Sequence, residues 1–581
     1  MSDNAPVHGL IVQLREAPTH AALARERGLG APDGERVHQR EQARWQGVLG
    51  AMPSVRVAGR RAVGESAQLM RFEQPMTAAQ AQDVAAQLAQ RPDVLWAAPN
   101  TRERRMQAAG APPSDPLFGG TSGQWWLQPV GGSDGVPITQ RLRGVAGFQT
   151  AWTSVTTGNS NSVIAVLDNG IVAHPDLVGK VIAGYDMVSD IEFSNDGDGR
   201  DVDPSDPGDW VNSTDLARPA YAGCAVETSS WHGTAIAGML VAIANNGQGG
   251  ASMNWPGKVL AVRVAAKCGA DVADIVDGMR WAAGLDVCSN AACTAFLPPN
   301  PNPARVINIS FGGTGTCDAY QGAINELGTL GVVVVAAAGN EHAATPTRPA
   351  KCPGVIGVGA LNRDGFKTTY SNFGSSLTVS TVGGDDPDGA WGNRVADSGL
   401  LGVGNVGSTM PDTSPQGSSY FNYFGTSFST PIVAGAISLM LAVNPALTAA
   451  QIERGLRVSA RPHVTSDLPG VGACSNDNPG RCLCTDSTCG TGILDVPRAL
   501  AYAANPSGYV ATPLQPARIN SAELRAAAAA GPDRPANPPT TTPPPPPPSG
   551  GNSGGGGAMS AWWLAALGAA VLALRRRAVP R

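Results

Sequence analysis

Three polar residues stand at the borders of apolar segments, and together their side chains could carry out nucleophilic catalysis. Asp168 ends the run "VIAVLD", His232 opens the segment "HGTAIAGML", and Ser427 begins the segment "SFSTPIVAGAISLML". A serine hydroxyl is a weak nucleophile at neutral pH, so it needs a neighbouring base, and the base needs a carboxylate that orients it. These residue types predict an aspartate–histidine–serine triad, provided that the fold brings the three side chains together.

A fourth polar residue, Asn340, follows the run "VVVVAAAG". When a serine attacks a carbonyl group, negative charge develops on the carbonyl oxygen, and donors that point at this oxygen stabilise the intermediate. The side-chain N–H of Asn340 and the backbone N–H of Ser427 are the predicted donors. The alternative is that Gly339 and Asn340 form an ordinary turn, which is a common use of this pair. The complete triad beside it favours the oxyanion role.

The residues that carry this chemistry stand among short apolar runs between residues 114 and 505. Such runs predict strands that are buried on both faces, in a parallel sheet covered by helices. Ligands of such α/β sheets bind beyond the carboxyl ends of the strands, which is where Asp168 and Asn340 stand. The predicted strands are Val163–Leu167, Val181–Tyr185, Val259–Val264, Val306–Ser310, Val332–Ala338 and Val355–Ala360.

Residues 1–110 differ in composition, contain no cysteine, and predict a separate small α+β domain. Its alternative is a binding domain with a function of its own. The pattern predicts helices over residues 19–28 and 77–91 and strands over Gly9–Arg15, Ala67–Glu73 and Asp93–Pro99.

The motifs resemble those of the subtilisin-like serine proteases, peptidase family S8. The segment "DNG" at Asp168 is similar to Asp-Ser/Thr-Gly, "HGT" at His232 to His-Gly-Thr, and "GTSFSTP" around Ser427 to Gly-Thr-Ser-x-x-x-Pro. Asn340 matches the family's oxyanion asparagine, and the order Asp, His, Ser is that of subtilisin. The resemblance covers residues 114–505 and implies a doubly wound, mainly parallel sheet. It also implies a serine endopeptidase that works through an acyl-enzyme.

Two residues depart from the family's pattern. Asn169 stands where Ser or Thr is usual, and Phe428 stands where Met is common. Neither change removes a catalytic atom, so we expect altered packing around the site and the same reaction. Pro431 is expected in the first turn of the helix after Ser427, where its missing N–H costs little. His174, in "HPDL", is interpreted as a structural residue.

The resemblance also implies a groove in which an extended substrate pairs with the enzyme as an added strand. Ser310, Phe311 and Gly312 would line one side of this groove, and Ala337 and Gly339 would line the other. The alternative is that these residues belong to plain core strands. The alanine and glycine residues in these walls favour an open, apolar pocket for the substrate side chain before the scissile bond.

By the same resemblance, residues 1–110 are similar to an inhibitory pro-segment of the inhibitor I9 type. This implies a zymogen, a ferredoxin-like fold for the segment, and inhibition of the protease by its own N-terminal part. Cleavage is expected between Arg105 and Asp115, and Asp115–Leu127 would form the N-terminal arm of the mature enzyme.

The segment Ser189–Trp210 carries eight acidic residues among glycines and prolines. Carboxylates at this density repel one another unless a cation neutralises them, and oxygen ligands on a flexible loop favour Ca²⁺. The alternative is a solvated acidic loop, because Pro207 stands where an EF-hand loop requires its last glutamate. The predicted ligands are Asp190, Asp196, Asp198, Asp201 and Asp203.

All ten cysteines lie between Cys224 and Cys489. An even number in a Gly- and Pro-rich chain predicts disulfides formed in an oxidising compartment. A zinc site is the alternative for the cluster at Cys474–Cys489, but the spacings lack paired Cys-x2-Cys units and the cluster has no histidine. Cys288 and Cys293 are expected to pair, and the other connectivities stay open.

The C-terminal sequence predicts a linker over residues 506–557 and a hydrophobic segment over residues 558–581. The linker joins a polyproline spacer to a glycine run. Ala558–Leu574 has no charge over 17 residues, and three arginines follow it. This tail resembles the GlyGly-CTERM sorting signals of Gram-negative bacteria, which implies a secreted or cell-envelope protein and a rhomboid-type protease that removes the tail. The alternatives are a permanent membrane anchor and a buried helix.

The start of the sequence, "MSDNAPVHGLIVQL", lacks the charged and apolar regions of a signal peptide. The prediction of secretion therefore depends on the cysteines, the pro-segment and the tail, and the tail is the predicted membrane contact. The mild net charge of −5 and the absence of a basic stripe argue against nucleic-acid binding. Two other functions remain: a sedolisin, which uses Ser-Glu-Asp, and an inactive surface-anchored binding scaffold. His232 and Asn340 argue against both.

Overall fold

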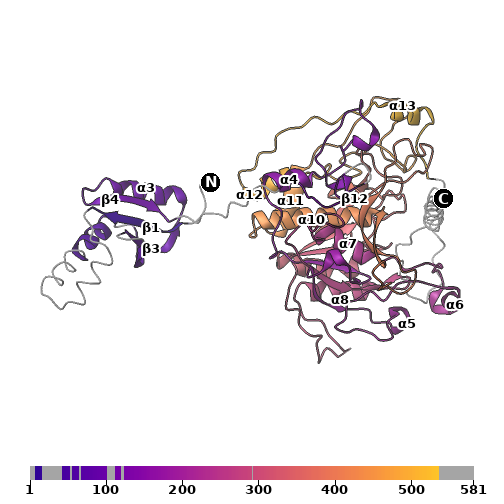
Figure 1. Ribbon diagram of the computed structural model, residues 1–581, viewed down its shortest axis with the longest axis horizontal. Coiled ribbons are helices and arrows are strands. Elements are labelled where there is room, and N and C mark those ends of the chain that lie inside the picture. The colour runs from indigo at the N-terminus through magenta and orange to yellow at the C-terminus, as the bar shows by residue number, and fades with distance from the viewer. Residues whose placement is uncertain are drawn as a thin grey trace, which may run out of the picture. The chain divides into compact units, whose positions relative to one another are not determined.

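The chain divides into two compact units, Met1–Ala108 and Ala109–Arg581 (Figure 1). The computed structural model describes residues 7–15, 42–52, 55–63, 67–100, 111–119, 123–290 and 292–535. The predicted helix over residues 19–28 and the hydrophobic tail over residues 558–581 lie outside the described residues. So do residues 105–110 of the predicted cleavage region and residues 536–557 of the predicted linker.

The first unit is a four-stranded antiparallel sheet in the order β2-β3-β1-β4. Its elements are β1 (Val7–Leu14), a helix over 42–50, β2 (Val57–Val63), β3 (Ala67–Met76), α3 (Ala78–Ala89) and β4 (Val94–Pro99). Leu10, Val12 and Leu14 are buried on one face of β1, so a single core lies on that face of the sheet. This element order and strand order are ferredoxin-like. Neither β2 nor the helix over 42–50 was predicted from the sequence pattern.

The second unit contains a seven-stranded sheet in which every pair of neighbouring strands is parallel. Its order is β13-β12-β11-β10-β5-β7-β6, so the strand order reverses about β5, as in a doubly wound fold. The strands are β5 (Ile164–Asp168), β6 (Val181–Asp186), β7 (Val259–Arg263), β10 (Val306–Ile309), β11 (Val333–Ala337), β12 (Val355–Leu361) and β13 (Val379–Val382).

Alternate residues of β5 belong to different hydrophobic cores, which shows that both faces of the sheet are covered. Ile164 and Val166 pack into one core with α4 (Phe148–Ser154), α7 (His232–Val241), α10 (Thr426–Val443) and α12 (Val496–Ala504). Ala165 and Leu167 pack into the other core with α8 (Val272–Ala282) and α9 (Asp318–Thr329). The predicted α/β class is therefore confirmed.

The helix α10 is long and apolar enough to cross a membrane, and it is the one such helix in the described part of the chain. Its most apolar stretch is 83% buried inside the protein, however, so α10 is a core helix. This burial explains its continuous apolar sequence, because a helix packed on all sides needs no polar face.

Shorter elements connect and cover the two main layers. An antiparallel hairpin, β14 (Leu400–Asn405) with β15 (Ser418–Tyr423), packs β14 against α7. The remaining elements are η1 (Trp125–Leu127), η2 (Ile138–Gln140), η3 (Pro175–Leu177), α5 (Ile191–Ser194), α6 (Ser213–Leu216), η4 (Pro219–Tyr221), β8 (Ala265–Ala266), β9 (Gly269–Ala270), α11 (Ala449–Ser459) and α13 (Ala522–Ala529).

The segment 506–535 does not form the linker that its composition predicts. Ile519 and Leu524 are fully buried in a satellite core, and α13 lies over this core. The carboxylate of Asp533, also fully buried, accepts from Arg481 Nη1 at 2.9 Å and from the Trp391 backbone N–H at 3.0 Å. A few buried anchors therefore hold an otherwise polar and Pro-rich segment, which we call the C-terminal strap (residues 506–535).

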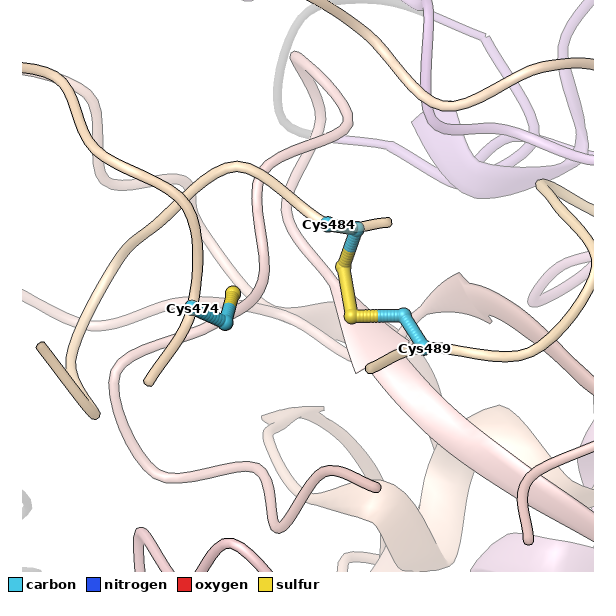
Figure 2. Close-up of side chains that lie close together, drawn as sticks. All are labelled: Cys474, Cys484 and Cys489. Carbon is cyan, nitrogen blue, oxygen red and sulfur yellow. A yellow bond between two sulfur atoms is a disulfide. The ribbon is translucent and has the colours of Figure 1, made fainter. Parts of the chain in front are cut away.

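All ten cysteines are paired, and the expected bond between Cys288 and Cys293 is present. Figure 2 shows Cys474 beside the disulfide of Cys484 and Cys489, a group whose sulfur atoms lie close enough together to suggest a metal site. Because Cys474 is bonded to Cys482, these sulfurs are not thiolates and cannot bind zinc. The other bonds are Cys224–Cys268 and Cys317–Cys352.

Candidate active site

Asp168 and His232 meet where β5 ends and α7 begins. His232 Nδ1 lies 2.9 Å and 3.0 Å from the two carboxylate oxygens of Asp168, which is 1% exposed. Trp231 adopts a left-handed conformation with φ of 51° just before α7, and its indole N–H donates to the Gly407 carbonyl at 2.7 Å. With Nδ1–H donated to Asp168, His232 Nε2 is the nitrogen that can accept a proton.

His232 is enclosed by two aromatic rings. The ring centroids of Phe311 and Phe428 lie 5.7 Å and 5.2 Å from that of the imidazole, and Tyr423 stacks on Phe428 at 4.7 Å. Burial alone would lower the pKa of His232, but the charge and hydrogen bond of Asp168 outweigh it and raise this pKa above its ordinary value. The site therefore favours the protonated imidazole that a general base becomes.

Ser427 is the second residue of α10, and its backbone carbonyl has an unusual partner. Pro431 is the sixth residue of the helix rather than part of its first turn as expected, so it has no N–H to donate to the Ser427 carbonyl four residues earlier. The Ser310 hydroxyl donates to this carbonyl instead, at 2.9 Å. In return, Ser427 Oγ donates to the Ser310 carbonyl at 3.1 Å. This exchange ties the start of α10 to the end of β10.

Asn340 lies beside the start of α10 with its amide oriented by Thr426. Its Oδ1 accepts from both the backbone N–H and the hydroxyl of Thr426, each at 2.9 Å, which leaves Nδ2 as the free donor. Gly425 has a φ of 138°, and a Cβ built on it would lie 3.7 Å from both Asn340 Nδ2 and the Ser427 nitrogen. The two predicted oxyanion donors therefore border the same point, which Gly425 leaves open.

This chain is similar to a protein family, to named relatives and to a solved structure. The model of the subtilase family matches residues 159–486. The chain belongs to the subtilase family. It is 39% identical over 361 residues to the extracellular protease of Xanthomonas campestris pv. campestris, which covers 62% of this chain and 54% of the relative. It is 36% identical over 281 residues to the extracellular basic protease of Dichelobacter nodosus, with 48% of this chain and 42% of the relative covered.

A solved protease from Pseudoalteromonas arctica matches this subtilase with a TM-score of 0.55 and 36% identity, over 68% of this chain and 100% of that one. The chain spans about half the length of the two extracellular relatives. Subtilases are serine proteases that share the α/β fold seen here, so the predictions of family and fold are confirmed.

The predicted substrate-binding residues of this subtilase lie next to the site. Ser310 is mostly buried and uses its hydroxyl and its carbonyl to hold Ser427. Phe311 and Gly312 follow β10 and are half-buried. Ala337 is a buried end residue of β11, and Gly339 is half-buried with its N–H donating to the Thr426 hydroxyl at 3.1 Å. Ser310 and Gly339 thus also contact the start of α10, which carries the predicted nucleophile Ser427.

The turn that carries Asn340 is shaped by a residue that was not among the predicted site residues. Asn372 is buried, and its Oδ1 accepts from the backbone N–H groups of Glu341 and Ala343 at 3.0 Å and 2.8 Å. Its Nδ2 donates to the Ala338 carbonyl at 3.1 Å and to the Glu341 carboxylate at 2.5 Å. One amide therefore fixes the turn that carries Asn340. The local pattern "YSNFG" gives no sign of this role.

The acidic loop Ser189–Trp210 does not form a ready coordination shell. Among the described residues, no three of its carboxylates bring ligand oxygens within 4.8 Å of one another. Asp196 forms an ion pair with the buried Arg263. Asp190, Asp201 and Asp203 each accept a hydrogen bond from the backbone N–H two residues ahead, at 2.8 to 3.0 Å. Without a cation, these predicted ligands are therefore held by an arginine and by the loop's own turns.

Asp198 is one of four exposed residues among the five predicted ligands. Slight burial, followed by the nearby charges of Asp196 and Asp201, raises the pKa of Asp198 above its ordinary value. Like charges therefore do crowd at this point of the loop, as the sequence predicts. His174, by contrast, is a structural residue as expected: its Nδ1 accepts from the Asp176 backbone N–H at 3.1 Å and caps η3.

Proposed function

We propose that this subtilase is a serine endopeptidase in which Asp168, His232 and Ser427 are the catalytic residues and Asn340 supplies an oxyanion donor. The observation that carries the proposal is the pairing of His232 Nδ1 with the buried Asp168, 2.9 Å apart. The oriented Asn340 amide beside the start of α10 supports it. An inactive binding scaffold would have no need for either feature.

In the proposed reaction, Ser427 Oγ attacks the carbonyl carbon of the substrate while His232 Nε2 takes the hydroxyl proton. The Ser427 hydroxyl must first leave the Ser310 carbonyl, which it contacts in the free enzyme. Free enzymes often make such catalytic hydrogen bonds only when substrate is bound. Asp168 keeps Nδ1 protonated and stabilises the imidazolium, and it does not itself take the proton.

The tetrahedral intermediate carries its negative charge on the former carbonyl oxygen. Asn340 Nδ2 and the Ser427 backbone N–H would donate to this oxygen, and the positive end of α10 adds to their effect. The imidazolium then protonates the leaving amine, and the C–N bond breaks to give the acyl-enzyme. Water, deprotonated by His232, attacks the ester, and collapse of the second intermediate returns the proton to Ser427 Oγ. The residues Ser310, Phe311, Gly312, Ala337 and Gly339 would border the bound peptide.

The first test is labelling with a fluorophosphonate, which reacts with activated serines. The protein should be freed of residues 1–110 beforehand, and the adduct should be located by mass spectrometry. We expect one adduct, on Ser427, that is lost in Ser427→Ala and kept in Ser376→Ala, a change at an exposed serine. A folded and trimmed protein that takes up no label would contradict the hydrolase and favour the binding scaffold.

The zymogen is a second part of the proposal. Residues 1–110 would act as an intramolecular inhibitor, and the ferredoxin-like fold of Met1–Ala108 supports this role. Asp115 is buried and accepts from the backbone N–H groups of Asn245 and Asn246 at 2.7 Å and 3.0 Å, so we expect the cut before Asp115. N-terminal sequencing checks this: the wild type should shorten during storage, and Ser427→Ala should keep its full length.

Calcium binding by the acidic loop also stays a proposal. The crowding of charge around Asp198 supports it, whereas the pairing of Asp196 with Arg263 argues against a preformed site. We expect that adding calcium in excess raises the melting temperature and that a chelator reverses the rise. The rise should shrink in Asp198→Asn and persist in Asp477→Asn, which removes an exposed charge from the cysteine-rich segment. Equal melting curves with calcium and chelator would contradict the proposal.

The proposed location is outside the cytoplasm, either secreted or in the cell envelope of a Gram-negative bacterium. Five disulfides and the names of the extracellular relatives support it. The tail over residues 558–581 would direct sorting and be removed by a rhomboid-type protease. Mass measurement of protein from the culture medium checks this: a mature C-terminus before residue 558 supports removal, and an intact tail in the membrane fraction supports an anchor.

A further inference from the structure

A second carboxylate, Asp209, lies one hydrogen bond away from both catalytic elements. Its Oδ1 accepts from the Ser230 backbone N–H at 2.7 Å, and its Oδ2 accepts from the Ser230 hydroxyl at 2.6 Å. The same Oδ2 accepts from Asn169 Nδ2 at 3.2 Å. Ser230 stands two residues before His232, and Asn169 directly follows Asp168. Asp209 itself is the last acidic residue of the loop Ser189–Trp210, and it is distant in sequence from both Asn169 and Ser230.

Asn169 joins these parts into one network. Its backbone N–H donates to Asp168 Oδ1 at 2.9 Å, and its side-chain Oδ1 accepts from the Gly233 backbone N–H at 2.9 Å. Its Nδ2 donates to the Ser230 hydroxyl at 3.0 Å as well as to Asp209. A serine or threonine here would have one short hydroxyl and could not reach both α7 and Asp209. The departure at position 169 is thus explained by a partner on the acidic loop.

We propose that Asp209 is a positioning residue for His232, which it holds through Ser230 and Asn169 and whose imidazolium it stabilises by its charge. This inference rests on the proposed triad. Asp209 does not contact the reacting atoms, so it is not a catalytic residue. Its place at the end of Ser189–Trp210 also means that the acidic loop supports the catalytic machinery, whether or not the loop binds a cation.

The charged groups around this network determine how a substitution of Asp209 should change the pKa of His232. Asp168 contacts His232, and the negative charge of Asp209 raises the pKa of His232 further. Asp206 is buried beside them. Its burial, followed by the charge of Asp209, raises the pKa of Asp206 well above the ordinary range. Glu227 also faces Asp209, and the pKa of Glu227 is raised by burial and then by that charge. The positive charge of Arg263 acts on Asp206 from β7.

The test compares pH profiles of kcat/KM for the activated wild type and Asp209→Asn. His232 must be neutral to act as a base, so activity falls as pH drops through its pKa. Removing the negative charge lowers that pKa, and we expect the acidic limb to move down by about half a pH unit. The plateau of kcat/KM should fall about tenfold, because the imidazolium in the transition state loses part of its stabilisation and the imidazole also loses part of its positioning.

Two further variants separate charge from hydrogen bonding. Ser230→Ala removes the hydroxyl that joins Asp209 to Asn169 but keeps the carboxylate, so the plateau should fall while the acidic limb stays in place. Asp209→Glu restores the charge and should return the limb to its wild-type position. The matched control is Asp477→Asn, which changes the net charge equally at an exposed site in the cysteine-rich segment and should leave both values unchanged.

The outcomes of this test and of the proposed function can be told apart by fluorophosphonate labelling of each variant. If Ser427 is labelled and the acidic limb of Asp209→Asn coincides with that of the wild type, the role of Asp209 is overturned and the triad stands. The role of Asp209 is likewise overturned, and the triad stands, if Asp209→Glu and Asp209→Asn give the same pH profile of kcat/KM. If the wild type takes no label on Ser427, the proposed function fails first and this inference fails with it.

Discussion

At the scale of single residues, the proposed reaction depends on the protonation of His232. Burial opposes its protonation, while the hydrogen bond and charge of Asp168 outweigh burial and raise the pKa of His232. The free enzyme should therefore lose kcat/KM, as pH falls, at a midpoint above the ordinary histidine pKa of about 6.5. Asp168→Asn keeps the shape but favours the wrong imidazole tautomer, and should lower kcat by about 10⁴-fold and move this midpoint down. A midpoint that stays in place in Asp168→Asn would argue that another group titrates.

The amide of Asn340 gives a second prediction at this scale. Loss of one oxyanion donor costs about 10²–10³ in turnover, a magnitude that was measured in a subtilisin. Asn340→Ala should show this loss in kcat with little change in KM, because the oxyanion forms after binding. Asn340→Asp keeps the acceptor for Thr426 but brings a negative charge to the oxyanion, so it should be at least as impaired. Steady-state kinetics on a peptide ester checks both. Equal activity of wild type and Asn340→Ala would remove Asn340 from the mechanism.

These residues also show which parts of a site a sequence can predict. Asp168, His232, Ser427 and Asn340 stand in local motifs, because each must sit at the end of a strand or the start of a helix. The residues that hold these four in place stand in no such motif. Asp209 is 41 residues from Asp168, and only the folded loop brings its carboxylate to its hydrogen-bond partners. Asn372 and the predicted calcium ligands give the same lesson, since hydrogen bonds and ion pairs within the fold decide what each polar side chain does.

At the scale of elements, the apolar strands were predictable and the polar ones were not. The runs that became β5, β7, β11 and β12 are almost free of polar atoms, as central parallel strands require. The strand β13 has the sequence "VSTV", and its polar residues are buried. The Ser380 hydroxyl there donates to the Cys489 carbonyl at 2.8 Å, a partner 109 residues away. A strand whose burial depends on such a partner carries no local signal.

The start of α10 gives a prediction that depends on two elements together. Because Pro431 has no N–H, Ser310→Ala should leave the Ser427 carbonyl without its donor, at a cost of about 1 to 3 kcal/mol in unfolding free energy. Pro431→Ala alone supplies a backbone N–H to this carbonyl, and the double variant should be more stable than Ser310→Ala. Urea unfolding should be measured in the Ser427→Ala background, which prevents self-digestion. The four proteins to compare are the parent, Ser310→Ala, Pro431→Ala and the double variant. Additive effects of the two changes would show that the hydroxyl and the missing N–H are unrelated.

At the scale of the whole molecule, composition misled the reading of the C-terminal strap. Residues 506–518 are mostly exposed, and the Pro- and Ala-rich sequence predicts a linker. The strap is nevertheless held at separate points: Ile519 N–H donates to the Thr465 carbonyl at 2.8 Å, Arg141 pairs with Glu523 at 3.0 Å, and Asp533 meets Arg481. Few anchors suffice because each one is buried or satisfies a buried group, and such isolated anchors leave no periodic pattern in the sequence.

The strap therefore sets how far the folded enzyme can be shortened. A chain that ends after residue 535 should keep the melting temperature and kcat/KM of the activated enzyme, whereas one that ends after residue 505 should lose both.

The physical reason is Arg481, which is fully buried between Asp385 at 2.5 Å and Asp533 at 2.9 Å. Removing one partner of a buried ion pair costs about 3 to 5 kcal/mol, and Asp533→Ala in the longer chain should lose stability on this scale. Arg534→Ala, a change at an exposed neighbour, is the matched control and should unfold like the wild type. Thermal unfolding followed by circular dichroism measures all four proteins. If the chain that ends after residue 505 has the same melting temperature as the longer chain, the strap does not stabilise the fold. The folded unit would then end at residue 505, as the composition suggested.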